Sequence, residues 1–157
     1  MPGQQPKQTL VGRTIQSADS SMPVSYKVME WLRSTSVLGT YLAVHSAVAL
    51  KIELQVLNSA LTAQSDFASR FISQLKVLVA LSVPSLVQVY DYGRDGGYFF
   101  IVIEHHKSPT LRVKLDTDGR LPLPIALNHA RLIAETLSYA AAQGVLHGLL
   151  SPDAVTL

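Results

Sequence analysis

The chain has 157 residues, enough for a domain with its own hydrophobic core, and it contains no cysteine. Disulfides, thiol catalysis and thiolate metal sites are therefore excluded. Its formal net charge of +2 is too small and too scattered to indicate nucleic-acid binding. Apolar residues make up 48% of the chain and charged residues only 15%, which indicates apolar surface that something else covers.

The amino-terminal segment, residues 1–23, is rich in Gln, Ser and Pro and predicts a flexible lead-in. It lacks the apolar core of a secretory signal. Together with the absence of cysteine, this places the expected protein in the cytoplasm.

Three apolar, β-prone stretches follow at short intervals and predict an antiparallel meander: 24–32, 37–44 and 47–53. Residues 34–50 carry no Asp, Glu, Lys or Arg, so a membrane-spanning helix is the alternative interpretation. The stretch is short for a span and contains several hydroxyl groups and a glycine. Two strands joined by a turn are therefore the favoured prediction.

A helix is predicted next, with Ser65 as its N-cap and Asp66 in its first turn, where a carboxylate suits the positive helix end. Pro84 ends it. Four apolar residues recur at helical spacing and form the face expected to point inward: Phe67, Phe71, Leu75 and Leu78.

Two further strands are predicted at 87–92 and 98–104, on either side of the hairpin signal Arg94-Asp95-Gly96-Gly97. The first hundred residues therefore predict five strands and one helix, with the helix between the third and fourth strands.

The remainder is predicted to be helical. A short helix opens at 108–110 and runs to about Leu115, and 116–120 is a loop. A long helix ends at Gln143, with Gly144 as its stop. Its inward face is predicted to consist mostly of small residues: Ala130, Ile133, Ala134, Leu137, Ala140 and Ala141.

Several motifs occur in an order that resembles a bacterial Ser/Thr protein kinase domain over residues 24–157. The matching segments are Val48–Lys51, Arg70–Gln74, Leu81–Gly93, Phe100–Glu104, Thr110–Leu111 and Tyr139–Pro152. The resemblance implies an α+β fold in which 24–104 is the amino-terminal lobe, a five-stranded antiparallel sheet with one helix. It makes 105–157 the hinge and a partial carboxy-terminal lobe, truncated after the catalytic loop.

The segment that resembles the catalytic loop lacks the reactive groups of the family. Leu149 stands at the position of the catalytic Asp, Ser151 at that of the Lys, and Ala154 at that of the metal-holding Asn. Leucine accepts no proton and alanine binds no metal ion. The resemblance therefore implies a degenerate kinase, a pseudokinase that is not an enzyme.

The segment that resembles the nucleotide-binding loop, residues 32–41, has Gly39 as its only glycine, at a position where the family has none. Val37 and Leu38 add side chains where phosphates need bare backbone amides. We expect no ATP binding and no other cofactor.

The resemblance assigns vestigial nucleotide contacts to four residues: Lys51, Ala49, Glu104 and His106. Gln74 replaces the helix carboxylate that usually pairs with the lysine. Glu53 lies on the same strand face as Lys51 and could replace that partner, whereas the alternative is a Lys51 that extends to solvent.

The histidines do not indicate a metal site. His105 and His106 are adjacent on an extended segment and point in opposite directions, so exposed hinge residues are expected. His147 belongs to the catalytic-loop motif, where the family uses it structurally, and His129 is a surface or half-buried helix residue. Residues 116–119 faintly resemble a Ca²⁺ loop without its glutamate.

The sequence therefore predicts a catalytically inactive kinase-like scaffold or regulator. Its expected partner is another protein that covers the open face of the partial carboxy-terminal lobe. One alternative is a structural subunit of a stable assembly, through which any membrane contact would occur. The other is a residual ATP-binding fragment of a larger Ser/Thr kinase-like protein.

Overall fold

The computed structural model describes residues 10–17, 24–35, 37–59, 65–148 and 150–157. The chain divides into two compact units. Unit 1 comprises Met1–Ala80 and Val87–His105, and unit 2 comprises Leu81–Leu86 and His106–Leu157. The short segment before β5 thus belongs with the later helices, not with the sheet that surrounds it in the sequence.

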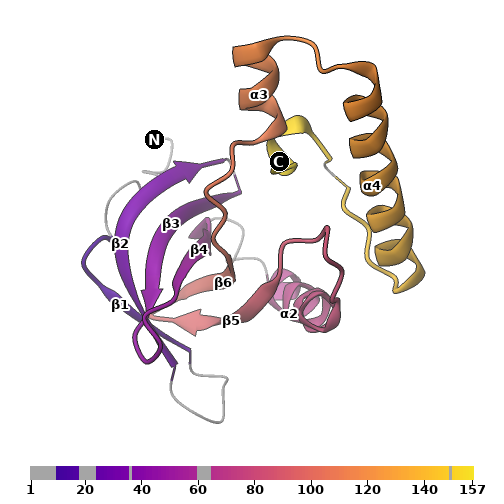
Figure 1. The fold of residues 1–157 in the computed structure, drawn as a ribbon. Helices are drawn as coiled ribbons and strands as arrows, with labels where there is room; N and C mark the ends of the chain where they lie inside the picture. The colour runs from indigo at the N-terminus through magenta and orange to yellow at the C-terminus, as the bar shows by residue number, and fades with distance from the viewer. Residues whose placement is uncertain (1–9, 18–23, 36, 60–64, 149) are drawn as a thin grey trace, which may run out of the picture. The chain divides into compact units, whose positions relative to one another are not determined.

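Unit 1 contains a six-stranded antiparallel sheet with the strand order β1-β2-β3-β4-β6-β5 (Figure 1). Helix α2 (Ser65–Ala80) follows β4 in the chain and packs beside β5. The strands are β1 (Thr14–Ser17), β2 (Val24–Ser34), β3 (Leu38–His45), β4 (Lys51–Leu57), β5 (Val89–Asp95) and β6 (Tyr98–Glu104). The α+β class is confirmed, and the sheet has six strands where five were predicted.

The additional strand, β1, lies inside the predicted lead-in, residues 1–23. It pairs with β2, with Ile15 opposite Tyr26, and both Leu10 and Ile15 are buried in the core. A flexible lead-in is therefore wrong for residues 10–17. Pairing with a long neighbouring strand and burial of two isolated apolar side chains stabilise a segment whose composition is mostly polar.

The core of unit 1 is built from alternate residues of neighbouring strands, as expected when successive side chains point to opposite faces. Tyr41, Leu54 and Phe100 are fully buried there. The two outer strands approach each other, because the amide of Gln16 in β1 donates to Asp95 Oδ2 at the end of β5, at 2.9 Å. The sheet therefore curves around its own core.

The turns explain where the strands begin. Gly96 and Gly97 have φ values of 53° and 89° and connect β5 to β6 as a two-residue turn, as the sequence predicted. The predicted strand 47–53 begins late, at Lys51, because Ala49 adopts φ 54° and its amide donates to the His45 carbonyl. No helix among the described residues is long and apolar enough to cross a membrane.

Helix α2 carries the predicted inward face, with Leu75 buried and Phe67, Phe71 and Leu78 partly buried. The rings of Phe67 and Phe71 stack with centroids 5.6 Å apart. The helix ends at Ala80, before Pro84. The i, i+4 spacing of these aromatic residues thus fixes which face of α2 turns toward the protein.

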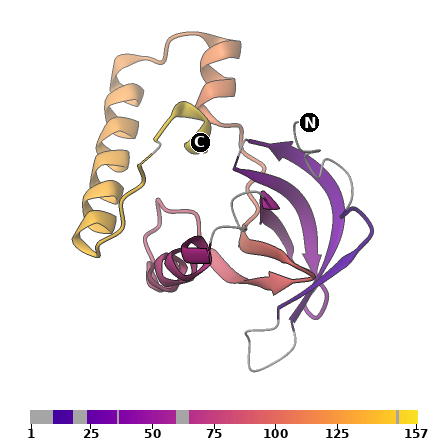
Figure 2. The ribbon, with the colours of Figure 1, turned by 180° about the vertical axis from the view of Figure 1, so that it is seen from behind.

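Unit 2 contains α3 (Leu111–Asp118), α4 (Leu123–Ala142) and the short 3₁₀ helix η1 (Pro152–Ala154), which lies beside α3 (Figure 2). Thr110 caps α3, because its side-chain oxygen accepts from the Val113 amide. Residues 116–118 of the predicted loop 116–120 belong to α3, which ends at Asp118 and is followed by the C-cap Gly119 with φ 76°.

The inward face of α4 differs from the prediction. Ala140 is buried and Ile133 and Leu137 are partly buried, whereas Ala130, Ala134 and Ala141 do not share one buried face with them. The partly buried face instead includes Thr136, whose hydroxyl forms a hydrogen bond with the Ser85 hydroxyl in the segment before β5.

Candidate functional site

The segment 32–41, which resembles a nucleotide-binding loop, forms the end of β2, a tight turn and the start of β3. Thr35 Oγ1 accepts from the amides of Val37 and Leu38, each at 3.2 Å, and the Thr35 amide donates to the Leu38 carbonyl at 2.8 Å. A loop that holds phosphates needs free amides. Here a side chain of the same loop satisfies two of them.

Lys51 lies at the far end of the same ladder. It is the first residue of β4 and faces Val44, whereas Leu38 at the turn faces Leu57. The six steps from Lys51 to Leu57 correspond to about 20 Å at ~3.3 Å per residue. A lysine side chain spans only a fraction of that length. Lys51 therefore lies far along the strand from the tip of the turn at Leu38.

The Lys51 side chain is exposed, and within the described ranges it makes neither an ion pair nor a hydrogen bond. Neither Gln74 nor Glu53, the two residues considered as partners for Lys51, bonds to its side chain. Gln74 is exposed on α2, where it lines a shallow hollow of about 300 Å³ with Phe67, Arg70 and Phe71.

The other assigned nucleotide contacts lie near the start of β4. Ala49 is in the turn before β4. Glu104 is the last residue of β6, faces Ile52 and donates its amide to the Gln88 carbonyl at 2.9 Å. His106 follows and is partly buried. The Glu104 backbone therefore pairs with β4 on one side and bonds to the Gln88 carbonyl on the other.

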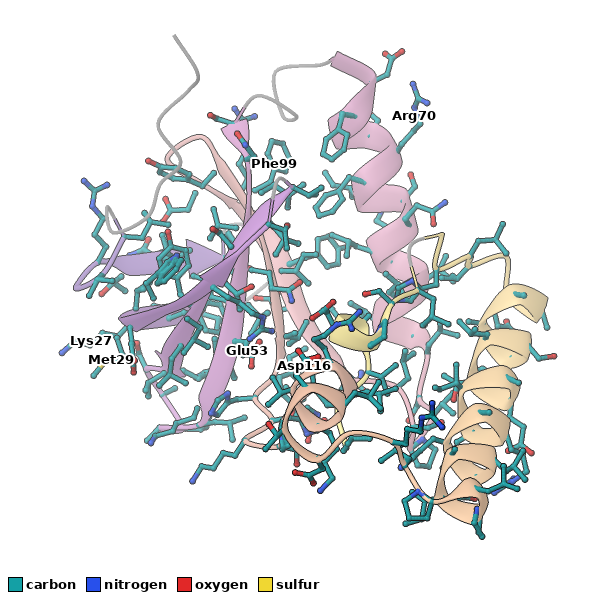
Figure 3. The ribbon with its side chains drawn as sticks, turned by 90° about the horizontal axis from the view of Figure 1, so that it is seen from above. Lys27, Met29, Glu53, Arg70, Phe99 and Asp116 are labelled. Atoms are coloured by element: carbon teal, nitrogen blue, oxygen red, sulfur yellow. The ribbon has the colours of Figure 1, made fainter. Side chains whose placement is uncertain are left out.

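Glu53, labelled in Figure 3, is the buried charged residue of the described sheet. Its carboxylate has two partners. Oε2 accepts from Arg33 Nη2 at 2.7 Å, and Oε1 lies 3.3 Å from His105 Nδ1. The side chain of Glu53 is 7% exposed and that of His105 is 16% exposed. Lys27 and Met29, by contrast, project outward from β2.

These contacts replace two predictions. Glu53 was a candidate partner for Lys51 on the same strand face, and it pairs with Arg33 and His105 instead. His105 and His106 were expected to be exposed, and both are at least partly buried. The sequence signal for Arg33 was only its position at the edge of an uncharged stretch, because its contact with Glu53 crosses an intervening strand.

A second buried polar contact joins β2 to β5. The hydroxyl of Tyr26 donates to Asp91 Oδ2 at 2.7 Å, and Tyr26 is buried in the core. Burial, followed by the hydrogen bond to Asp91 and the carboxylate's charge, raises the pKa of Tyr26 well above its ordinary value near 10. The phenol is therefore neutral and a donor at any physiological pH.

The segment that resembles the catalytic loop lies in unit 2. Ser151 precedes η1 and Ala154 is its last residue, and the Ala154 amide donates to the Ser151 carbonyl at 3.0 Å. Asp153 lies 3.8 Å from Arg112 of α3, and His147 is exposed. Leu149 lies outside the described residues.

Metal-ligand clusters are not found either: no group of three or more His, Cys, Asp or Glu side chains is suitably placed in the described part of the chain.

The order of the sheet, helix α2 and the later helices along the chain is that of a protein kinase domain. The kinase domain of Mycobacterium tuberculosis PknI superposes with a TM-score of 0.76 at 26% identity, over 84% of this chain and 55% of that one. Another crystal structure of the same kinase domain gives a TM-score of 0.74 at 25% identity, over 82% and 52%.

Curated sequences point to the same family, although no family model matches the chain. Serine/threonine-protein kinase Pkn2 of Myxococcus xanthus is 29% identical over 83% of this chain and 16% of its own length. PknL of M. tuberculosis is 29% identical over 88% and 34%. PkaA of Streptomyces coelicolor is 31% identical over 80% and 23%. The chain thus spans between a sixth and a third of these relatives.

The chain is therefore a bacterial Ser/Thr protein kinase-like domain, and it covers about half of the kinase domains it superposes on. This corrects the prediction that the protein is not an enzyme. That prediction rested on substituted motif positions, whereas the relatives are all named Ser/Thr protein kinases. The fold and the sequence comparisons show a kinase-like domain.

Proposed function

We propose that this chain is a protein-binding, regulatory module of the Ser/Thr protein kinase family. The observation that carries the proposal is the apolar surface of unit 2. Leu123 and Leu127 of α4 are 71% and 60% exposed, and Leu146 after that helix is 80% exposed. Leu123 and Leu127 are four residues apart and therefore share one helix face.

An apolar helix face of this kind stabilises an interface when it is covered. Burying one leucine side chain is worth roughly 1.5–3 kcal/mol, so a few such residues supply a substantial part of a binding free energy. The partner we propose is a protein with an apolar helical surface, which would pack against α4 as helices pack in domain cores. We expect the interaction to take place in the cytoplasm.

The test is capture of partners from the native source with the tagged chain as bait. We expect the wild-type chain to retain a defined protein stoichiometrically, and Leu127→Glu to lose it. Val48→Glu is the matched control, because Val48 is similarly exposed but lies in the β3–β4 turn of unit 1. A wild-type chain that purifies as a lone, monodisperse monomer and captures no partner would contradict the proposal.

A second candidate is the nucleotide-binding part of a larger Ser/Thr kinase. It is favoured by the names of the relatives and by the retained strand Phe100–Glu104 with its backbone intact. A ligand at one hundred times its dissociation constant stabilises by about 2.7 kcal/mol. A clear rise of the melting temperature with millimolar Mg²⁺-ATP would support this candidate, and an unchanged temperature would exclude it.

A further inference from the structure

The contacts of Glu53 have no role in the proposed protein-binding function. The side chains of Arg33, Glu53 and His105, called the Glu53 clamp below, lie entirely in unit 1. Both carboxylate oxygens of Glu53 are occupied, one by Arg33 and one by His105. A buried carboxylate is costly unless it is paired in this way.

The clamp spans most of the sheet. Arg33 belongs to β2 and reaches Glu53 in β4 across β3, because the strand order is β2-β3-β4. Glu53 faces Ile103 of β6, and His105 lies two residues beyond Ile103, on the same side of that extended chain. Lys51 shares the strand face of Glu53 and points to solvent, and Glu30 of β2 lies in the same cross-strand row as Glu53, opposite Leu42.

The two ends of the clamp coincide with two segments of the kinase resemblance. Arg33 lies in 32–41, the segment that resembles the nucleotide loop, and His105 lies in the segment that resembles the hinge. The resemblance implies that a bound nucleotide would contact both segments. Here an ion pair and a histidine contact join them through protein atoms alone.

We propose that the Glu53 clamp takes the place of a nucleotide and holds the β2–β3 hairpin to the segment after β6 without any ligand. The amides of Val37 and Leu38 already bonded to Thr35 and the distance of Lys51 from the turn support this assignment. The clamp is a conformational device of unit 1, so it does not depend on whether unit 2 binds a partner.

Hydrogen exchange of the purified chain tests the clamp, read at the amides of residues 33–38 and 103–106. We expect Glu53→Gln to speed exchange at both segments at least threefold. Arg33→Gln is expected to speed exchange at 103–106, and His105→Gln at 33–38, each at the end that it does not touch. The matched control is Glu135→Gln, which removes an exposed pair with Arg131 in α4 and leaves both segments unchanged.

Combining the substitutions decides whether Glu53 carries the coupling. In a Glu53→Gln background, Arg33→Gln and His105→Gln are expected to add nothing at the distant end. Effects confined to each variant's own segment, or effects that persist in that background, would overturn the clamp. Should Glu53→Gln fail to fold, as reported by the fluorescence of Trp31, the two single variants and their double variant still give the coupling.

A nucleotide arm completes the test. Millimolar Mg²⁺-ATP is expected to leave exchange at both segments of the wild-type chain unchanged, because protein side chains already join them. Slower exchange at both segments on adding Mg²⁺-ATP would show that a nucleotide binds with the clamp in place, and would overturn the proposal. Neither result bears on partner capture through Leu127.

Discussion

Unit 1 and unit 2 differ in how far they bury their large apolar residues. In unit 1, Tyr41, Leu54 and Phe100 are fully buried. In unit 2 the buried hydrophobic residues among those described are Leu81, Ala140 and Val145, while several leucines are exposed. A sheet that curves until its outer strands meet encloses a core by itself, whereas α3 and α4 leave open faces.

The difference implies that the two units depend differently on their surroundings. Unit 1 gains its free energy of folding from contacts within the chain, and unit 2 has apolar surface still to bury. Each of the following substitutions tests that contrast, and they are given in order of decreasing expected effect on the stability of unit 1. The single tryptophan, Trp31 in β2, reports on unit 1 alone.

Leu54→Ala is expected to have the largest effect. Leu54 is fully buried, and removing a buried leucine typically lowers the free energy of unfolding by about 2–5 kcal/mol. Urea unfolding followed by Trp31 fluorescence measures it. The matched variant Leu127→Ala in α4 should lie within about 0.5 kcal/mol of wild type, and equal losses would refute the contrast.

Gly93→Ala tests the closure of the sheet. A Cβ at this position in β5 would lie 2.9 Å from Phe100 Cζ and 3.4 Å from Ser17 Oγ of β1. Overpacking of this kind costs about 1–3 kcal/mol. The control is Gly39→Ala in β3, where the nearest atom of Tyr41 is at an ordinary 3.5 Å. Similar melting temperatures for the two variants would show that β1 and β5 are not tightly packed.

Tyr26→Phe tests the polar contact in the core. Because the pKa of Tyr26 is raised in the folded state, the neutral phenol stabilises the fold fully below pH 10, and that contribution falls as the pH rises above the unfolded value. We expect the free energy of unfolding to decline above about pH 10, less steeply in the phenylalanine variant. At neutral pH the lost bond to Asp91 should cost about 1 kcal/mol. Identical alkaline profiles in urea titrations would contradict this.

Leu127→Glu should have the smallest effect on the isolated chain. The side chain is 60% exposed, so Trp31-monitored stability should change by no more than about 0.5 kcal/mol. A large destabilisation of unit 1 would mean that α4 contributes to its core, against the contrast drawn above.

Much of the fold could be predicted because its signals are local. The alternation of apolar residues located most strands, Gly96 and Gly97 defined one hairpin, and Gly144 with φ 78° marked the end of α4. β1 was missed because two apolar residues in a polar segment carry no periodic signal. Its pairing is decided by β2, which is adjacent only in the folded sheet.

The candidate site was predicted less well, for a reason rooted in strand register. The sequence by itself determined the family resemblance, the α+β class and the substituted residues Leu149, Ser151 and Ala154. Only the tertiary structure decided that Lys51 lies about 20 Å along β4 from the turn and that Glu53 pairs with Arg33 and His105. Those contacts depend on which strands lie side by side and in what register, and no local pattern of residues encodes that choice.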